Sequence, residues 1–184
     1  SSAASDVYKR QVMGTVKLKS SDEVFQLKIS LLGSDPEIWR TIQISSAATL
    51  SRLHKAIQSA FDWEDSHLHE FTTIKHEKIN KRQKLKEVLR VGKKIIYTYD
   101  FGDCWEHLIT VESRQSPDLN KKYPCCIDGQ NHAPFEDIGG IFGYLDILDA
   151  LQDPKHPRYD DYMQIIEDEI GEIEFDPTYF NSHD

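Results

Sequence analysis

The chain has 184 residues, of which 39% are hydrophobic, and a formal net charge of −9. This length supports one domain built around a single core. No run of about 18 apolar residues occurs, and the first residues lack the apolar stretch of a signal peptide, so the sequence predicts neither a membrane span nor a membrane partner. Three cysteines cannot all pair with one another, and reduced thiols predict a cytoplasmic protein.

The charge changes sign along the chain. Residues 1–94 carry 17 Lys and Arg against 11 Asp and Glu, whereas residues 95–184 carry 5 against 20. The basic excess is greatest over residues 75–94, where the candidate nucleic-acid contacts are Lys78, Lys81, Arg82, Lys84 and Lys86. Because that segment has no Phe, Tyr or Trp to stack on bases, a solvated helix or loop is favoured. Alternatively, it faces the acidic part of the chain, within the molecule or in a second copy.

Residues 1–23 are predicted to be a disordered or non-native tail, because the first eleven are small and polar without a hydrophobic period. The domain is expected to span residues 24–184. Residues 24–31 alternate between polar and apolar side chains, residues 33–36 form a turn, and residues 38–44 alternate again. This pattern predicts a β-hairpin.

A helix is expected to follow, with Thr49 as its N-cap. Its apolar residues share one face and are Leu50, Leu53, Ile57, Ala60 and Phe61. Next come a strand over residues 68–74, a helical turn near 85–89 and a hairpin over 95–112. The alternation of strands and a helix is typical of an α+β fold.

Gly and Pro recur through residues 123–143, which predicts a long loop. A short helix over 144–151, an acidic helix over 159–170 and a docking segment over 175–180 are expected after it. The predicted fold is therefore a single α+β domain in which antiparallel hairpins form a mixed sheet packed by a few helices. The long Gly/Pro loop precedes the C-terminal helices.

The most chemically varied stretch is YTYDFGDCWEH at residues 97–107. Tyr97 and Tyr99 lie on one side of a strand and Gly102 marks a turn, so the polar side chains gather at a hairpin tip. Together with residues 67–70 at the start of the expected third strand, this stretch gives a candidate functional cluster. Its members are His67, His69, Glu70, Tyr99, Asp100, Asp103, Trp105, Glu106 and His107.

Two histidines suggest a metal. His67 and His69 are two residues apart on an expected strand, so their side chains point the same way and can grip one ion. A divalent metal is thus a candidate cofactor, with His67, His69, Asp103 and His107 as candidate ligands. The alternative is that His69 and His107 are hydrogen-bonded packing residues beside two tryptophans.

Asp100 and Asp103 have a structural interpretation as well, because short carboxylates accept backbone N–H groups around a glycine turn. The glycines at 139, 140 and 143 precede a helix and could present amides to an anion, but a tight turn also explains them.

The vicinal pair Cys125 and Cys126 is followed by Asp128 and His132. A thiol with a histidine and a carboxylate suggests a nucleophile or a metal site. Neither spacing is diagnostic, and buried small side chains are the favoured interpretation.

Several separated motifs occur in an order that resembles a known family. They are PEIWR at 36–40, FDWEDSHLHEF at 61–71, YTYDFGDCWEH at 97–107, YPC at 123–125, GG at 139–140, GY at 143–144 and FDP at 175–177. Residues 24–180 resemble the plasmid pRiA4b ORF-3-like family. The resemblance implies a single α+β domain found in bacteria, archaea and their mobile elements, without an established biochemical role. Relatives often carry an acidic residue at the position of Cys104, so a role for this thiol would be particular to this protein.

Two functions are consistent with these features. The preferred one is a noncatalytic binding or adaptor module, whose aromatic residues form a core and an aromatic-rimmed groove for a protein partner or a second copy, with nucleic acid as a weaker option. Those aromatic residues are Trp39, Trp63, Trp105, Tyr97 and Tyr99. The alternative is a small metal-dependent hydrolase acting on a phosphate or amide bond, with Glu106 as a base. Its metal ligands would be His67, His69, Asp100, Asp103 and His107.

Overall fold

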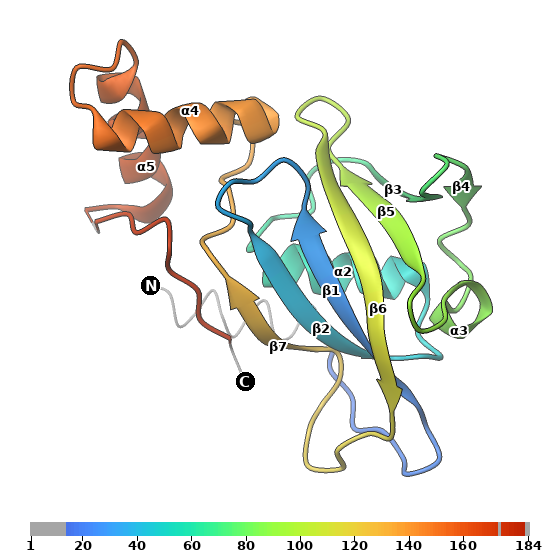
Figure 1. Cartoon of the computed structure of the whole chain (residues 1–184). Coiled ribbons are helices and arrows are strands. Elements are labelled where there is room, and N and C mark those ends of the chain that lie inside the picture. The colour runs from blue at the N-terminus through green and yellow to red at the C-terminus, as the bar shows by residue number, and fades with distance from the viewer. Residues whose placement is uncertain (1–13, 173, 183–184) are drawn as a thin grey trace.

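The computed structural model describes residues 14–172 and 174–182 (Figure 1). Seven strands form one sheet in the order β4-β3-β5-β6-β1-β2-β7. The strands are β1 (Val24–Leu31), β2 (Trp39–Ser45), β3 (His69–Thr73), β4 (Lys78–Ile79), β5 (Lys94–Tyr99), β6 (Trp105–Gln115) and β7 (Cys125–Gln130). The described helices are α2 (Leu50–Ala60), α3 (Leu85–Val88), α4 (Gly140–Gln152) and α5 (Tyr159–Ile170). The predicted α+β fold is confirmed, and its sheet, expected to be mixed, is antiparallel at every named pair.

The β1–β2 hairpin follows the alternation seen in the sequence. Leu27 and Ile29 of β1 are fully buried, whereas Lys28 between them is half-buried on the opposite face. β1 pairs with β2 on one side and with the long strand β6 on the other, so it lies inside the sheet. One face of the strands therefore supplies most of the core.

Helix α2 covers that core face and lies behind the strands in Figure 1. The Thr49 side chain accepts a hydrogen bond from the backbone N–H of Arg52, which confirms the predicted N-cap. Leu50, Leu53 and Ile57 are all buried at 0% exposure. Each such side chain contributes about 1.5–3 kcal/mol by its removal from water.

The predicted loop over residues 123–143 is partly wrong, because it contains an edge strand. β7 pairs with β2 from Gln43 to Trp39, with a register shift between Thr41 and Ile42. Its side chains are half-buried or exposed, so its sequence has none of the strict alternation that marks a strand with one buried face. Helix α4 also begins earlier than expected, at Gly140.

Helices α4 and α5 build a second, smaller core at the β7 side of the molecule (Figure 1). Its fully or nearly buried members are Phe135, Ile147, Ala150, Tyr162 and Ile166. Phe175 packs against this core and against the main one. The segment 175–180 is thus the docking segment that the sequence predicts.

Arg40 holds the end of the docking segment 175–180 in place. Its guanidinium is 3% exposed and donates hydrogen bonds to the backbone carbonyls of Ala60, Trp39, Gln130 and Asn131. The Phe180 ring lies 4.4 Å from the guanidinium carbon. Burial lowers the pKa of Arg40 to about 10, and the carbonyls satisfy its donors in place of a carboxylate.

The N-terminal tail prediction is only partly covered, since residues 1–13 lie outside the described residues. Within residues 14–23 the structure differs from a disordered tail. Val16 exchanges two backbone hydrogen bonds of 2.8 Å with Tyr123. None of the described helices has the length and apolar content needed to cross a bilayer.

Gly140, at the start of α4, provides a test of how closely this helix packs on the turn between β5 and β6. Gly140 has a φ of +70°, and a Cβ there would lie 2.2 Å from the carbonyl oxygen of Asp103. We expect Gly140→Ala to destabilise the protein by roughly 3 kcal/mol or more in urea unfolding, because backbone strain and a clash add.

The matched control is Gly92→Ala. Gly92 has a similar φ of +84°, but an added Cβ would meet nothing within 4 Å. This variant should lose only about 1–2 kcal/mol, the cost of the left-handed backbone. Equal losses in the two variants would contradict the close packing of α4 on the hairpin tip.

Candidate functional site

The β5–β6 turn, residues 100–104, meets two other loops at one end of the sheet. The backbone N–H of Asp100 donates to the Leu68 carbonyl at 2.8 Å. Asp103 Oδ2 accepts hydrogen bonds from the backbone N–H groups of Ile138 and Gly139, at 3.1 and 3.2 Å. The turn, the α2–β3 loop and the β7–α4 loop are therefore tied together.

The expected capping role of the two aspartates is correct for Asp100, whose Oδ1 accepts from the Gly102 N–H at 2.9 Å. Asp103 instead reaches across to the β7–α4 loop. That loop continues into the glycines at 139 and 140, where backbone packs on backbone. The tight-turn interpretation of these glycines accounts for them without an anion.

His67 lies between two carboxylates from different loops. Its Nε2 is 2.8 Å from Asp137 Oδ1 and 3.6 Å from Asp100 Oδ2. Partial desolvation lowers the pKa of the imidazole, but the attraction of Asp100 and Asp137 outweighs it, so the pKa of His67 is raised. The Asp100 side chain is 11% exposed, whereas the Asp137 side chain is 68% exposed.

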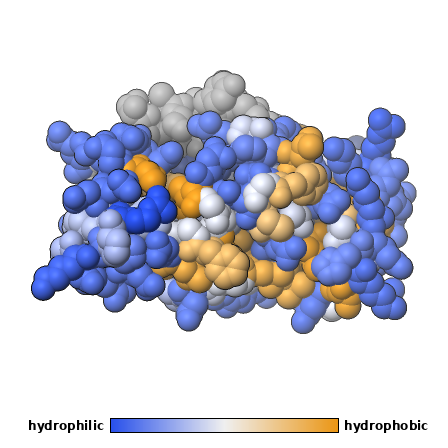
Figure 2. All heavy atoms as spheres, turned by 90° about the horizontal axis from the view of Figure 1, so that it is seen from above, coloured by the Kyte–Doolittle hydropathy of each residue, from blue (hydrophilic) through white to orange (hydrophobic). Residues whose placement is uncertain are grey.

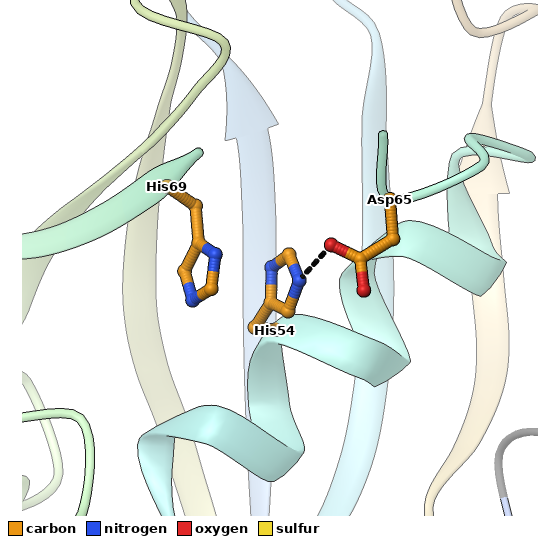
Figure 3. A group of neighbouring side chains, drawn as sticks. All are labelled: His54, Asp65 and His69. Atoms are coloured by element: carbon orange, nitrogen blue, oxygen red, sulfur yellow. Dashed lines mark hydrogen bonds and ion pairs between the residues drawn. The ribbon is translucent and has the colours of Figure 1, made fainter. Parts of the chain in front are cut away.

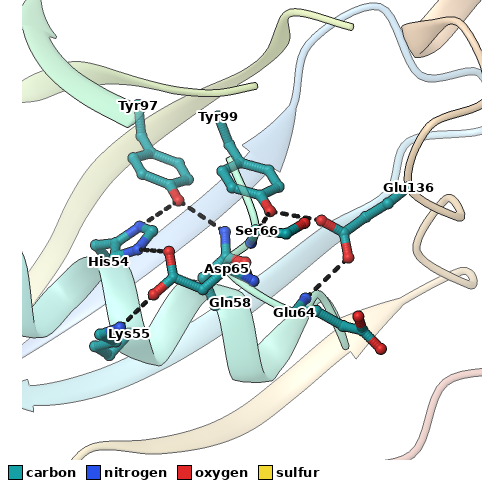
Figure 4. Close-up of polar contacts among 9 residues, drawn as sticks. All are labelled: His54, Lys55, Gln58, Glu64, Asp65, Ser66, Tyr97, Tyr99 and Glu136. Carbon is teal, nitrogen blue, oxygen red and sulfur yellow. Dashed lines mark hydrogen bonds and ion pairs between the residues drawn. The ribbon is translucent and has the colours of Figure 1, made fainter. Parts of the chain in front are cut away.

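A second polar network surrounds the Tyr99 hydroxyl (Figure 4). The Tyr99 hydroxyl donates to Glu136 Oε1 at 2.5 Å and accepts from the Ser66 backbone N–H at 3.0 Å. Glu136 Oε2 accepts from the Glu64 N–H at 2.9 Å. Burial, followed by the neighbouring carboxylate of Glu136, raises the pKa of Tyr99. The tyrosine is thus a neutral donor that holds both loops.

His69 belongs to a different group and does not face the same way as His67. β3 begins at His69, so His67 lies in the preceding loop and escapes the strand alternation. The His69 ring stacks on that of His54, with centroids 3.5 Å apart and an interplanar angle of 4° (Figure 3). The expectation that the two histidines share one metal is therefore not met by the structure.

His54 and Asp65 were absent from the sequence-based candidates. His54 Nε2 is 2.6 Å from Asp65 Oδ1, and its Nδ1 is 2.7 Å from the Tyr97 hydroxyl (Figure 4). Because the Asp65 carboxylate can only accept, the Nε2–H of His54 donates to it, and Nδ1 accepts from the Tyr97 hydroxyl. Gln58 Nε2 donates to the same hydroxyl. The available signal was the position of His54 on the apolar face of α2, where a polar side chain needs a buried partner.

This inner group is poorly suited to a cation. Both nitrogens of His54 are occupied, and Lys55 also contacts Asp65. Burial and the neighbouring His54 lower the pKa of His69 to about 4. The stacked imidazoles are neutral. His54 hydrogen-bonds through both ring nitrogens, whereas His69 Nε2 is buried without a hydrogen-bond partner among the described residues, so the His69 ring serves packing.

His107 and Trp105 are core residues. His107 is fully buried, its Nδ1–H donates to the Tyr97 carbonyl at 3.2 Å, and its ring packs edge-on against Phe61 and Trp63. Trp105 is 1% exposed. The structure therefore supports the interpretation of His107 as a packing residue. The four predicted metal ligands, His67, His69, Asp103 and His107, do not come together.

Glu70 and Glu106 belong to neither group of candidate metal ligands among the described residues. Glu70 is 4.0 Å from Lys78, and Cys104 Sγ is 3.9 Å from Glu106. Burial, followed by the charge of Glu106, raises the pKa of Cys104, which makes the thiol less reactive. The thiol is therefore a poor nucleophile.

The cysteine pair on β7 also lacks the features of a nucleophile. Burial raises the pKa of Cys126 to about 11. His132 Nδ1 bonds to the Ala133 carbonyl at 2.6 Å, and its ring packs on Phe175. The interpretation as packing residues is favoured.

Comparisons with known proteins identify the family of this chain. The family model described as "Plasmid pRiA4b ORF-3-like protein" matches residues 23–184. The chain belongs to this family. It is 35% identical over 155 residues to the uncharacterized protein y4hQ of Sinorhizobium fredii, covering 77% of this chain and 79% of that relative. It also resembles the crystal structure of MM3350 from Methanosarcina mazei Go1, a protein of unknown function, with a TM-score of 0.79 and 35% identity over 88% of this chain and 96% of that one.

This member of the family also has a groove beside α4. Its volume is about 1030 Å³. Its apolar side chains are Ile38, Tyr144, Leu145, Leu148, Leu151, Met163, Ile166 and Phe175, and its carboxylates are Asp35, Asp149, Glu167, Glu172 and Glu174. The lining includes no Lys or Arg among the described residues.

The hairpin-tip end offers a different kind of surface. Phe101, Leu68 and Phe142 are 51%, 73% and 82% exposed. Figure 2 views the molecule from above and shows orange apolar residues spread among blue hydrophilic ones. The groove differs because it collects its apolar side chains in a hollow.

The basic segment lies at the opposite edge of the sheet. β4 is one edge strand and β7 is the other, and α4 and α5 lie on the β7 side. Lys81, Lys84 and Lys86 are exposed to solvent. The structure supports the interpretation of the basic segment as a solvent-exposed surface. Within the molecule, this segment does not face the acidic helices.

Burial of His107 makes stability depend on pH. Its pKa is lowered to about 4 in the folded state by desolvation, against about 6.5 in an unfolded chain. The unfolded state thus binds more protons between these values, and the free energy of unfolding falls as the pH drops from about 6.5 to 4. The contribution of His107 to this loss is at most about 3 kcal/mol.

His107→Asn keeps a donor near the Tyr97 carbonyl but cannot titrate. We expect a less stable protein whose unfolding free energy falls less steeply over this pH range, measured by urea titrations at several pH values. The control is His76→Asn at an exposed position. An unchanged slope in His107→Asn would show that the buried imidazole is not the titrating group.

Proposed function

We propose that this protein is a noncatalytic binding domain that takes a basic, amphipathic segment of a partner protein into the groove between α4, α5 and the C-terminal segment. The observation that carries the proposal is the lining of the groove, an apolar floor with five carboxylates and no Lys or Arg among the described residues. A hollow of this kind has the size and character of a helix-binding or peptide-binding site.

Helix α4 supports this proposal because apolar side chains line it on two sides. Ile147 and Ala150 are fully buried in the second core. Leu145 and Leu148 lie at helical spacing on the groove side and are half-buried, and Leu148 also packs against the main core. The part of these two side chains that stays exposed in the groove is apolar surface that a partner can cover.

Charge complementarity selects the partner's chemistry. Asp149 and Glu167 are exposed at the groove, on α4 and α5, and residues 95–184 carry a net charge of −15. Acidic surroundings attract Lys and Arg and repel acidic segments, so they set specificity and association rate. A segment with leucine-like residues on one face and lysines on the other fits both properties.

The arrangement of the predicted catalytic residues favours binding over hydrolysis. Of the five ligands considered for a metal-dependent hydrolase, only His67 and Asp100 form an ion pair, while His69 stacks on His54 and His107 is in the core. On the family resemblance alone, we also propose that the partner belongs to a mobile element.

The test uses a fluorescein-labelled peptide of about 14 residues with Leu at helical spacing and Lys elsewhere. We expect saturable binding in fluorescence anisotropy that weakens with salt, and at least about tenfold weaker binding to Leu145→Glu, because a carboxylate would enter the apolar floor and face Asp149.

Leu119→Glu is the matched control, since Leu119 is 51% exposed in the β6–β7 loop, away from the groove. It should bind like the unaltered protein. A peptide with Glu in place of Lys should not bind. Equal affinity of Leu145→Glu and Leu119→Glu, or equal binding of the two peptides, would refute the proposal.

A further inference from the structure

The carboxylates around His67 have no cationic side chain to balance them. Among the ion pairs of the described residues, His67 is the partner of both Asp100 and Asp137, and neither pairs with a Lys or Arg. Asp100 is 7% exposed, and its Oδ2 reaches the imidazole only at 3.6 Å, beyond hydrogen-bond length. The Asp100 side chain, which is 11% exposed, thus places Oδ2 near the imidazole without a hydrogen bond to it.

The three ligand atoms have the spacing of a metal site. His67 Nε2 is 2.8 Å from Asp137 Oδ1 and 3.6 Å from Asp100 Oδ2, and all three atoms lie within 4.8 Å of one another. Tetrahedral coordination with bonds of about 2.0–2.1 Å requires ligand atoms about 3.4 Å apart. The exposed Asp137 side chain can make the small adjustment that is needed.

The loops around His67 hold the imidazole in place. Its ring packs edge-on against Tyr99, with centroids 5.8 Å apart. The Tyr99 hydroxyl is itself held by Ser66 and Glu136. Fixed ligand orientation is what separates a metal site from a flexible surface ion pair.

The inner group provides a contrast within the same molecule. His54, Asp65 and His69 are also close together, but Lys55 contacts Asp65, and both nitrogens of His54 already bond to protein atoms. Within the described part of the chain, His69 Nε2 is buried without a hydrogen-bond partner, but the lysine beside Asp65 makes a cation less favourable there than at the His67 group.

We propose that His67, Asp100 and Asp137 bind one divalent transition-metal ion, such as Zn²⁺, that joins the α2–β3 loop, the β5–β6 turn and the β7–α4 loop. One imidazole nitrogen and two carboxylate oxygens suit Zn²⁺ better than Mg²⁺, which prefers oxygen ligands only. The ion would lock the hairpin-tip end of the domain. This site is separate from the groove, so the two proposals can fail independently.

The probe is Zn²⁺ itself, titrated into the tag-free full chain by isothermal calorimetry and followed by thermal unfolding. We expect one ion per chain and a melting temperature that rises with Zn²⁺ concentration, because the ion binds the folded state. His67→Gln and Asp137→Asn should each weaken binding at least about tenfold, and Mg²⁺ should bind much more weakly than Zn²⁺.

Two controls separate this site from adventitious binding. His156→Gln removes another surface histidine that pairs with a carboxylate, Asp146 at 3.2 Å, and should leave Zn²⁺ affinity unchanged. Cys104→Ser should also leave it unchanged. The proposal is wrong if Zn²⁺ binding survives in both His67→Gln and Asp137→Asn, if it is lost in Cys104→Ser, or if the unaltered chain does not bind Zn²⁺.

Discussion

Two tyrosine hydroxyls on β5 connect the sheet to α2 and to two of the loops at the candidate site. Tyr97 and Tyr99 are fully buried and lie two residues apart, so the strand places both on its core face. The first hydroxyl holds α2 through His54 and Gln58, and the second holds the two loops through Ser66 and Glu136. Each hydroxyl both donates and accepts, so removing either would leave buried polar groups without partners.

This arrangement explains why the two histidine groups differ. On the inner side the tyrosines are surrounded by neutral imidazoles, and the nearby lysine balances Asp65. On the outer side, among the ion pairs of the described residues, Asp100 and Asp137 pair with His67 and with no lysine or arginine. The hairpin tip therefore concentrates negative charge on loops whose backbones are fixed by hydrogen bonds, a combination that favours ion binding over a purely structural role.

The C-terminal helices depend on a different constraint. Arg40 is buried without a carboxylate, and its donors are satisfied by carbonyls from β2, the end of α2 and the end of β7. Phe180 covers the guanidinium, and Phe175 joins the two cores. These contacts hold the C-terminal segment in the place where it forms one wall of the groove, so the groove exists because a buried cation anchors the chain that follows α5.

The sequence by itself determined the elements whose local pattern agrees with their final environment. β1, the capped helix α2 and the acidic helix α5 each bury one face. Their apolar residues therefore recur at the regular spacing of a strand or a helix, which can be recognised in the sequence. The separated motifs also identified the family. The strand β7 was missed because it is an edge strand, where half-exposed side chains leave no clear alternation.

Only the tertiary structure decided which polar residues meet. His67 and His69 are near in sequence but belong to separate groups, because β3 begins between them. Asp137 joins His67 from 70 residues away, and the groove combines side chains from 35 to 178. Such contacts depend on how loops and helices pack over the sheet, and no short-range period in a single sequence encodes that packing.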